Sequence, residues 1–142
     1  PVLSELQIGF VAFSPLANGF LSARYDQTSH FEKGTDYRSV MPQFSREGME
    51  KNKKLMEELS RMAREKEATP AQISLAWMLA KEPWIVPIPG TRKEDRLMEN
   101  AGASELVLTK EEVCALDQML DTTPMSEVFG GSRIAKQASG RN

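Results

Sequence analysis

The segment at residues 84–102 reads WIVPIPGTRKEDRLMENAG and joins two kinds of secondary structure through a short turn. The β-branched run at residues 85–88 predicts a strand, and Pro89-Gly90 ends it. The charged residues that follow favour a helix, with Thr91 as its expected cap. A strand, a turn and a helix in this order predict a β/α unit, so we expect parallel strands joined by helical crossovers.

The start of this helix is a predicted anion-binding site. Backbone N–H groups in the first turn of a helix lack intrahelical partners, and the macrodipole adds partial positive charge there. Arg92 lies in the turn and Arg96 one helical turn later, and two planar guanidinium groups can hold the several oxygens of a phosphate. The alternative is an ordinary surface helix, but its i,i+4 pairs Arg92 with Arg96 and Asp95 with Glu99 are of like charge.

A second apolar run, IGFVAF at residues 8–13, predicts a strand that is covered on both faces, as in a parallel sheet. Pro15 ends it, and Asn18-Gly19 permits a tight backbone. Ligands of α/β folds bind at turns after the carboxyl ends of strands, so this turn is a candidate binding loop. The alternative, a simple connecting turn, is favoured when the turn is considered alone.

The middle of the chain alternates between irregular and helical sequence. Residues 22–48 have no regular pattern, which predicts a functional lid or a mobile loop. His30 lies there without an acidic or thiol partner in a recognisable pattern, so we expect an exposed loop histidine. Helices are expected over residues 49–66 and 70–81, the second beginning after the cap Thr69 with Pro70. This second helix is apolar nearly all round and should be buried, with Trp77 in the core.

The C-terminal part predicts one more helix and an irregular tail. Residues 109–112 (TKEE) form a capping box, and apolar side chains then recur on one helical face. Cys114 lies one residue from that face and is predicted to be a small core or boundary residue. We expect residues 122–142, which include Gly130-Gly131 and few apolar anchors, to be partly ordered at most.

The composition excludes several classes of function. The 142 residues carry a formal net charge of −2 with a pI near 5.5, so binding to nucleic acid or an anionic membrane by bulk charge is not expected. No apolar run is long enough to span a bilayer, and the single cysteine fits a reducing, cytoplasmic location. Residues 1–6 look like the end of a helix whose beginning is missing, which indicates a fragment, a processed product or a trimmed chain.

Three sequence blocks resemble the aldo-keto reductases, a family of NADPH-dependent oxidoreductases. The blocks are IGFVAFSPLANGFL at residues 8–21, TPAQISLAWMLA at residues 69–80 and IVPIPGTRKEDRLMEN at residues 85–100. They occur in the family's order and spacing, and the resemblance covers residues 1–121. It implies an α/β fold, a partial (β/α)8 TIM barrel made of the last two β/α units with a long loop and a C-terminal helix, followed by the tail at residues 122–142.

The resemblance also implies a binding site for NADP. Phe13 would stack on the nicotinamide ring, the loop after it would lie along the pyrophosphate, and Arg96 would anchor the adenosine 2′-phosphate and favour NADP over NAD. Residues 25–44 resemble a loop that folds over the cofactor, and the tail after Asp121 a region that shapes the substrate pocket. The implied cofactor-binding residues are Phe13, Ser14, Pro15, Leu16, Asn18, Leu21, Ile88, Gly90, Thr91, Arg92, Arg96, Glu99 and Asn100.

The family's acid/base group does not occur in this chain. In the family it is a tyrosine tuned by a lysine, an aspartate and a histidine from the first half of the barrel, and Tyr25 and Tyr37 match none of these positions. Hydride transfer to a carbonyl needs a proton donor. We therefore assign no catalytic residue and no metal ligand, and expect the chain alone to be inactive, whereas the full-length parent would reduce small aldehydes or ketones to alcohols.

Two alternatives stay open. The chain could be a non-catalytic nucleotide-binding or regulatory module, like the channel-associated β subunits that share this barrel. It could also be a self-associating remnant, a homo-oligomer that buries exposed barrel edges and the apolar barrel face.

Overall fold

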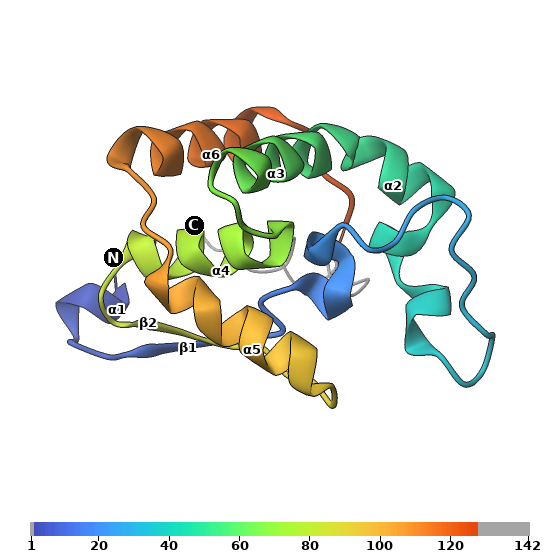
Figure 1. Cartoon of the computed structure of the whole chain (residues 1–142), viewed down its shortest axis with the longest axis horizontal. Coiled ribbons are helices and arrows are strands. Elements are labelled where there is room, and N and C mark those ends of the chain that lie inside the picture. Colours follow the sequence, from blue (N-terminus) through green and yellow to red (C-terminus); the bar gives the residue numbers. More distant parts are fainter. Residues whose placement is uncertain (1, 128–142) are drawn as a thin grey trace, which may run out of the picture.

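The structure, a computed structural model, describes residues 2–127 and combines two short parallel strands with helices (Figure 1). The elements in chain order are α1 (Val2–Glu5), β1 (Phe10–Phe13), the 3-10 helices η1 (Ala17–Ser22), η2 (Tyr37–Val40) and η3 (Pro42–Phe44), α2 (Arg46–Lys51), α3 (Lys53–Glu65), α4 (Pro70–Lys81), β2 (Ile85–Ile88), α5 (Glu94–Gly102), η4 (Ala103–Glu105) and α6 (Lys110–Thr122).

Helix α4 lies in the middle of the fold, between the layer of α3 and α6 and the layer of β1, β2 and α5 (Figure 1). It forms where the sequence predicts it. The Thr69 hydroxyl accepts a hydrogen bond from the Gln72 N–H at 3.2 Å, and the Gln72 side chain accepts one from the Thr69 N–H at 3.0 Å. This capping box and Pro70 fix the start of the helix, because both satisfy or remove amide donors that would otherwise lack partners.

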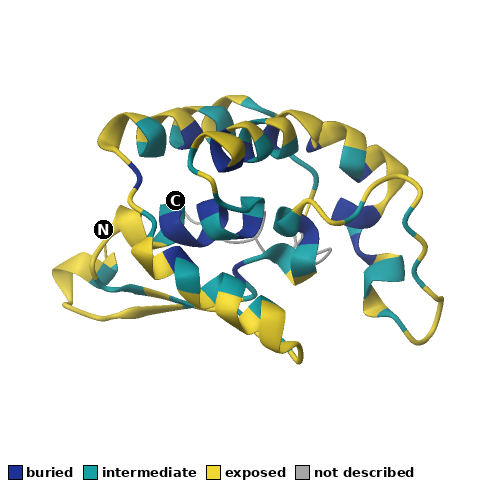
Figure 2. Cartoon of the chain, in the orientation of Figure 1, coloured by how far each residue is buried: buried dark blue, intermediate teal, exposed yellow. Residues whose placement is uncertain are grey.

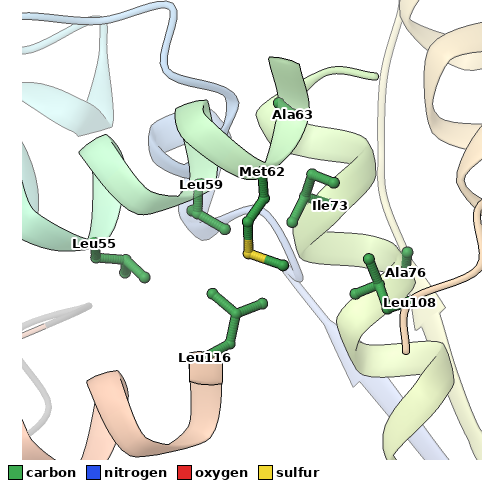
Figure 3. Packing of buried hydrophobic residues seen from close by; sticks show 8 residues of the cluster. All are labelled: Leu55, Leu59, Met62, Ala63, Ile73, Ala76, Leu108 and Leu116. Atoms are coloured by element: carbon green, nitrogen blue, oxygen red, sulfur yellow. The ribbon is translucent and has the colours of Figure 1, made fainter. Parts of the chain in front are cut away.

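The main core is formed where α3, α4 and α6 meet (Figure 3). Ile73 of α4 is completely buried, and its neighbours in the cluster are Leu55, Leu59, Met62, Ala63, Ala76, Leu108 and Leu116. Trp77 is only partly buried, and its indole N–H donates to the Asp117 carboxylate at 2.9 Å. The indole needs a polar partner, so Trp77 lies at the edge of the core rather than inside it.

The two strands pair in parallel, with Phe10 opposite Ile85 and Phe13 opposite Ile88. The prediction of a strand covered on both faces is wrong: Val11 is 59% exposed and Val86 53% exposed. Helix α4 packs on one side of β2, and the strands are largely exposed in Figure 2. Among residues 2–127 the sheet has two strands, too few to bring helices onto both of its faces.

Two other predictions are corrected by the helices. The helix expected over residues 49–66 is divided at Asn52, whose side-chain amide donates to the Ser126 hydroxyl at 2.7 Å and accepts from the Ser126 N–H at 2.9 Å. Cys114 is exposed instead of lying at the core boundary, because it is two positions from the buried Leu116 and therefore on another side of α6.

The segment at residues 22–48 is not structureless, contrary to the prediction. Tyr25, Phe31 and Phe44 pack against one another with ring centroids 4.9 to 5.6 Å apart, and Phe20 meets Phe44 edge-on at 5.5 Å. With Met41 these rings form a second small core, which orders the segment although it has no helical or strand periodicity. His30 is exposed, as expected.

The C-terminal capping box is confirmed: the Thr109 hydroxyl accepts from the Glu112 N–H at 3.3 Å, and the Glu112 carboxylate accepts from the Thr109 N–H at 2.7 Å. Helix α6 ends at Thr122. Most of the predicted tail, residues 128–142 including Gly130-Gly131, lies outside the described residues. Within residues 2–127, no helix is long and apolar enough to cross a membrane.

Candidate functional site

A cleft of about 500 Å³ lies between the loop after β1 and the segment that runs from β2 into α5. This volume is in the range of small-molecule sites, roughly 300–1,000 Å³. Its walls come from segments far apart in the chain: Ser14, Pro15, Leu16, Asn18, Gly19, Ser22, Arg24, Tyr25, Arg38, Ala71, Ile88, Pro89, Gly90, Thr91, Arg96, Glu99 and Asn100.

The cleft exists because β1 and β2 are parallel and in register. Phe13 and Ile88 are paired at the carboxyl ends of the two strands, so the chain leaves both strands at the same edge of the sheet. The loops that follow, beginning at Ser14 and Pro89, therefore face each other across one space.

Most of the residues that the sequence assigned to a cofactor line this cleft: Ser14, Pro15, Leu16, Asn18, Ile88, Gly90, Thr91, Arg96, Glu99 and Asn100. Phe13, Leu21 and Arg92 are not among the lining residues. Phe13 is 74% exposed at the end of β1. Leu21 lines a different, small apolar cavity of about 100 Å³ between α3, α4 and α6. It packs against both the main core and the aromatic core.

The loop after β1 has an unusual backbone. Ser14, Ala17, Asn18 and Gly19 have φ angles of 51°, 48°, 59° and 89°, which lie in the left-handed region. A Cβ atom at Gly19 would lie 3.2 Å from Cε2 of Tyr25, so glycine permits both the angle and the contact. Left-handed residues next to right-handed ones, as at Leu16 and Ala17, occur in backbone concavities that bind anions.

The helix on the other wall starts later than the sequence predicts. Thr91 is not its cap: the Thr91 hydroxyl accepts from the Lys93 N–H at 3.1 Å, and Lys93 occupies the N-cap position without a side-chain hydrogen bond. Helix α5 therefore begins at Glu94 and Arg96 lies in its first turn, whereas Arg92 precedes the helix and is exposed to solvent.

Arg96 is the arginine of the cleft that makes no ion pair with any other residue of the range 2–127. Its Nε is buried and makes no hydrogen bond within the described part of the chain, and no carboxylate of residues 2–127 forms an ion pair with it. A buried guanidinium nitrogen without a partner costs free energy unless a ligand supplies an acceptor. The site is therefore suited to an anion.

Glu99 is paired across the cleft with Arg24. Glu99 Oε2 lies 2.6 Å from Nη2 of Arg24, and the Glu99 side chain is only 13% exposed, compared with 43% for Arg24. The attraction within this pair offsets the like-charge repulsion between Asp95 and Glu99 that the sequence alone implies. Arg24 was not predicted as a site residue, and only its contact across 75 positions of sequence reveals it.

Arg38 is a further cleft residue that the sequence did not reveal. Its guanidinium carbon lies 4.9 Å from the ring centroid of Tyr25 and 4.6 Å from that of Phe31, and its Nε donates to Asp36 at 2.9 Å. The hydrogen bonds from Arg38 lower the pKa of the Asp36 carboxyl, and in return raise the pKa of Arg38. The sequence of residues 22–48 contains arginine and aromatic residues, which can form cation–π contacts, but which of them meet depends on how the segment folds.

The chemistry of the cleft is that of a binding site for an anionic ligand. Arginine side chains, hydroxyl groups and the loop backbone can hold phosphate oxygens, while the lining residues include no histidine or cysteine. Within residues 2–127 no group of three or more histidine, cysteine, aspartate or glutamate side chains could hold a metal ion.

Comparisons with known proteins agree on one family. The sequence model described as "Aldo/keto reductase family" matches residues 1–121. The chain is 38% identical over 117 residues to aldo-keto reductase str7 of Strobilurus tenacellus, covering 82% of this chain and 34% of the relative. It is 36% identical over 126 residues to aldo-keto reductase yakc [NADP(+)] of Schizosaccharomyces pombe, covering 89% and 36%.

Among solved structures, the fold is similar to the glycerol dehydrogenase AKR11B4 from Gluconobacter oxydans, with a TM-score of 0.77 at 23% identity. The match covers 92% of this chain and 39% of that chain. This chain thus spans about a third of the length of the curated relatives it matches.

Two glycines provide a matched test of the left-handed loop. Gly34 has a φ of 87° and open space where a Cβ atom would lie, whereas Gly19 has a φ of 89° and faces Tyr25. We expect Gly34→Ala to lower the free energy of unfolding by about 1 kcal/mol through backbone strain alone. Gly19→Ala should cost roughly 2 kcal/mol or more, because Tyr25 must also move. Urea denaturation of both variants measures the difference, and equal losses would show that the Tyr25 contact is unimportant.

Proposed function

This chain belongs to the aldo-keto reductase family, and on that premise we propose that its cleft binds the phosphate-bearing adenosine half of NADP. The family consists of oxidoreductases, and a nicotinamide cofactor is supported for it by the relative named for NADP(+). The observation that carries the proposal is Arg96, a cleft arginine with a buried Nε and no partner in the described chain.

The residues of the cleft fit the adenosine half of NADP in their chemistry. Arg96 would hold the 2′-phosphate, and this contact would favour NADP over NAD. The left-handed loop from Ser14 to Gly19 would lie along the pyrophosphate, and Asn100 would face the adenine with Glu99. Arg24 and Arg38 line the same walls, but each is already paired with a carboxylate, Glu99 and Asp36 respectively. Phe13 would lie beside the nicotinamide, at the end of β1.

We place the chain in the last part of a (β/α)8 barrel, with β1 and β2 as the last two strands. The similarity to the glycerol dehydrogenase supports a barrel-type α/β fold. The match covers 39% of that chain, which is long enough to include two β/α units of a barrel and the helix that follows them. The exposed side of the sheet, with Val11, Val86 and Ile88, would then be barrel interior.

The proposed reaction of the whole protein is reduction of an aldehyde or ketone to an alcohol. NADPH supplies the hydride when it is bound. The residues of this chain bind and orient that cofactor, but the lining residues include no lysine or histidine that could tune a tyrosine as proton donor. We assign no catalytic residue to the described chain.

A second role is favoured by the exposed sheet. The Phe10 N–H donates to the Trp84 carbonyl at 2.8 Å, which fixes the direction of the backbone groups of β2. The N–H groups of alternate residues of β2 then point toward β1, and the nitrogen of Pro87 lies at the opposite, outer edge, where proline has no N–H to donate. Pro87 opposes pairing of a further strand with the outer edge of β2, whereas β1 contains no proline that would oppose pairing at its own outer edge. We propose that a second copy of the chain associates along β1.

NADP binding depends on Arg96 in this proposal. Arg96→Met should weaken NADP binding about tenfold to a hundredfold, since a charge-assisted contact to phosphate contributes roughly 1.5–3 kcal/mol. Arg92→Met removes the same charge from an exposed position outside the cleft and should change the affinity by less than about threefold. Isothermal titration with NADP and NAD measures both, and equal effects of the two variants would contradict the assignment of Arg96.

The purified chain should show no turnover by itself. A proton donor is needed while the hydride arrives, and none is assigned in this chain. NADPH oxidation, followed by absorbance with a panel of aldehydes and ketones, should equal the rate without protein. Turnover that scales with the amount of chain would refute the prediction.

Self-association should depend on the exposed sheet. Val11→Lys places a charge on β1 and should shift the chain toward the monomer, because lysine in an edge strand opposes pairing between copies. Val107→Lys places the same charge at a residue that is 78% exposed and lies outside the sheet, so it should leave the oligomeric state unchanged. Light scattering after gel filtration at several concentrations distinguishes the outcomes, and a wild-type monomer at every concentration would exclude association along β1.

A further inference from the structure

The two walls of the cleft are joined by one ion pair. Among the ion pairs of residues 2–127, Arg24 with Glu99 is the pair in which both partners line the cleft. Arg24 follows η1 and precedes Tyr25, whose ring is held by Phe31 and Phe44. Its backbone is therefore anchored to the aromatic core, while its side chain reaches α5.

Glu99 has a second cation within reach, which it does not use. Arg96 lies three positions earlier on α5, and residues at i and i+3 of a helix are neighbours on its surface. Both side chains line the cleft, yet Glu99 pairs with Arg24 at 2.6 Å and Arg96 has no partner in the described chain. The largely buried Glu99 carboxylate needs a cation, so loss of Arg24 would turn it toward Arg96.

We propose that Arg24 is a positioning residue, which holds the Glu99 carboxylate away from Arg96 and so keeps Arg96 available for a phosphate group. This inference rests on the proposed function only for the identity of the phosphate as the 2′-phosphate of NADP. Arg24 acts through Glu99: it removes an internal competitor for the anion site. An anion site with a carboxylate already on its arginine would bind phosphate weakly, because the ligand would have to displace that carboxylate.

The proposal predicts a rescue by a second substitution. Arg24→Met should weaken NADP binding about tenfold, since Glu99 then competes for Arg96. In the double variant Arg24→Met/Glu99→Gln the competitor is neutral, so the affinity should return to within about threefold of Glu99→Gln alone. NAD, which lacks the 2′-phosphate, should lose much less affinity in Arg24→Met, so the preference for NADP over NAD should fall. Arg64→Met, which removes an exposed arginine of α3, controls for the loss of one positive charge.

A double variant that binds NADP as weakly as Arg24→Met would overturn the proposal, because it would show that Arg24 contacts the ligand itself. A second measurement does not need nucleotide: the side-chain Nε–Hε resonance of Arg96 in ¹⁵N NMR. It should shift in Arg24→Met, when Glu99 becomes its partner, and return toward the wild-type position in the double variant. An unchanged resonance in Arg24→Met would overturn the proposal. If wild type binds no NADP, the proposed function fails, and this resonance still decides the role of Arg24.

Discussion

Burial of helix α4 is the constraint on which the rest of the structure depends. The helix contacts α3 and α6 on one side and β2, α5 and η1 on the other, so it joins the helical core to the layer that carries the cleft. Its capping box fixes where it starts, and the completely buried Ile73 fixes which side faces α3. The position of the cleft follows from this packing, because Ala71 in its first turn is part of the cleft wall. Gly102 at the end of α5 also lies against Gln72, where a Cβ atom would be 2.9 Å from the side-chain nitrogen.

The cleft combines a rigid backbone on one wall with unsatisfied charge on the other. The left-handed loop after β1 is held by the aromatic core through Gly19 and Tyr25, while α5 supplies Arg96 from its first turn. The loop packs on the aromatic core and α5 contacts α4, so both walls of the cleft are fixed by contacts within the chain. Such preorganisation lowers the cost of binding, since less of the chain has to be ordered when the ligand arrives.

The sheet is the part of the molecule that differs most from a typical α/β domain. Parallel strands are normally buried on both faces, but here α4 packs on one side and Val11 and Val86 on β1 and β2 are more than half exposed. This arrangement agrees with a chain that spans about a third of the length of its relatives. Further β/α units that close the sheet into a barrel would bury the apolar residues that the described chain leaves in water, whereas a second copy along the edge of β1 would extend the sheet without covering this side.

Local sequence determined the elements whose signals are local. The capping box at residues 109–112, the start of α4 at the cap Thr69 and the parallel β/α order follow from residues a few positions apart. The family resemblance added most of the cleft residues, because its motifs record positions that meet in space. Only the tertiary structure decided the rest. The ion pair of Arg24 with Glu99, the stacking of Arg38 on Tyr25 and Phe31, and the turning of Leu21 into the core join residues distant in sequence. Periodicity cannot reveal such contacts, since their free energy depends on neighbours that the fold alone brings together.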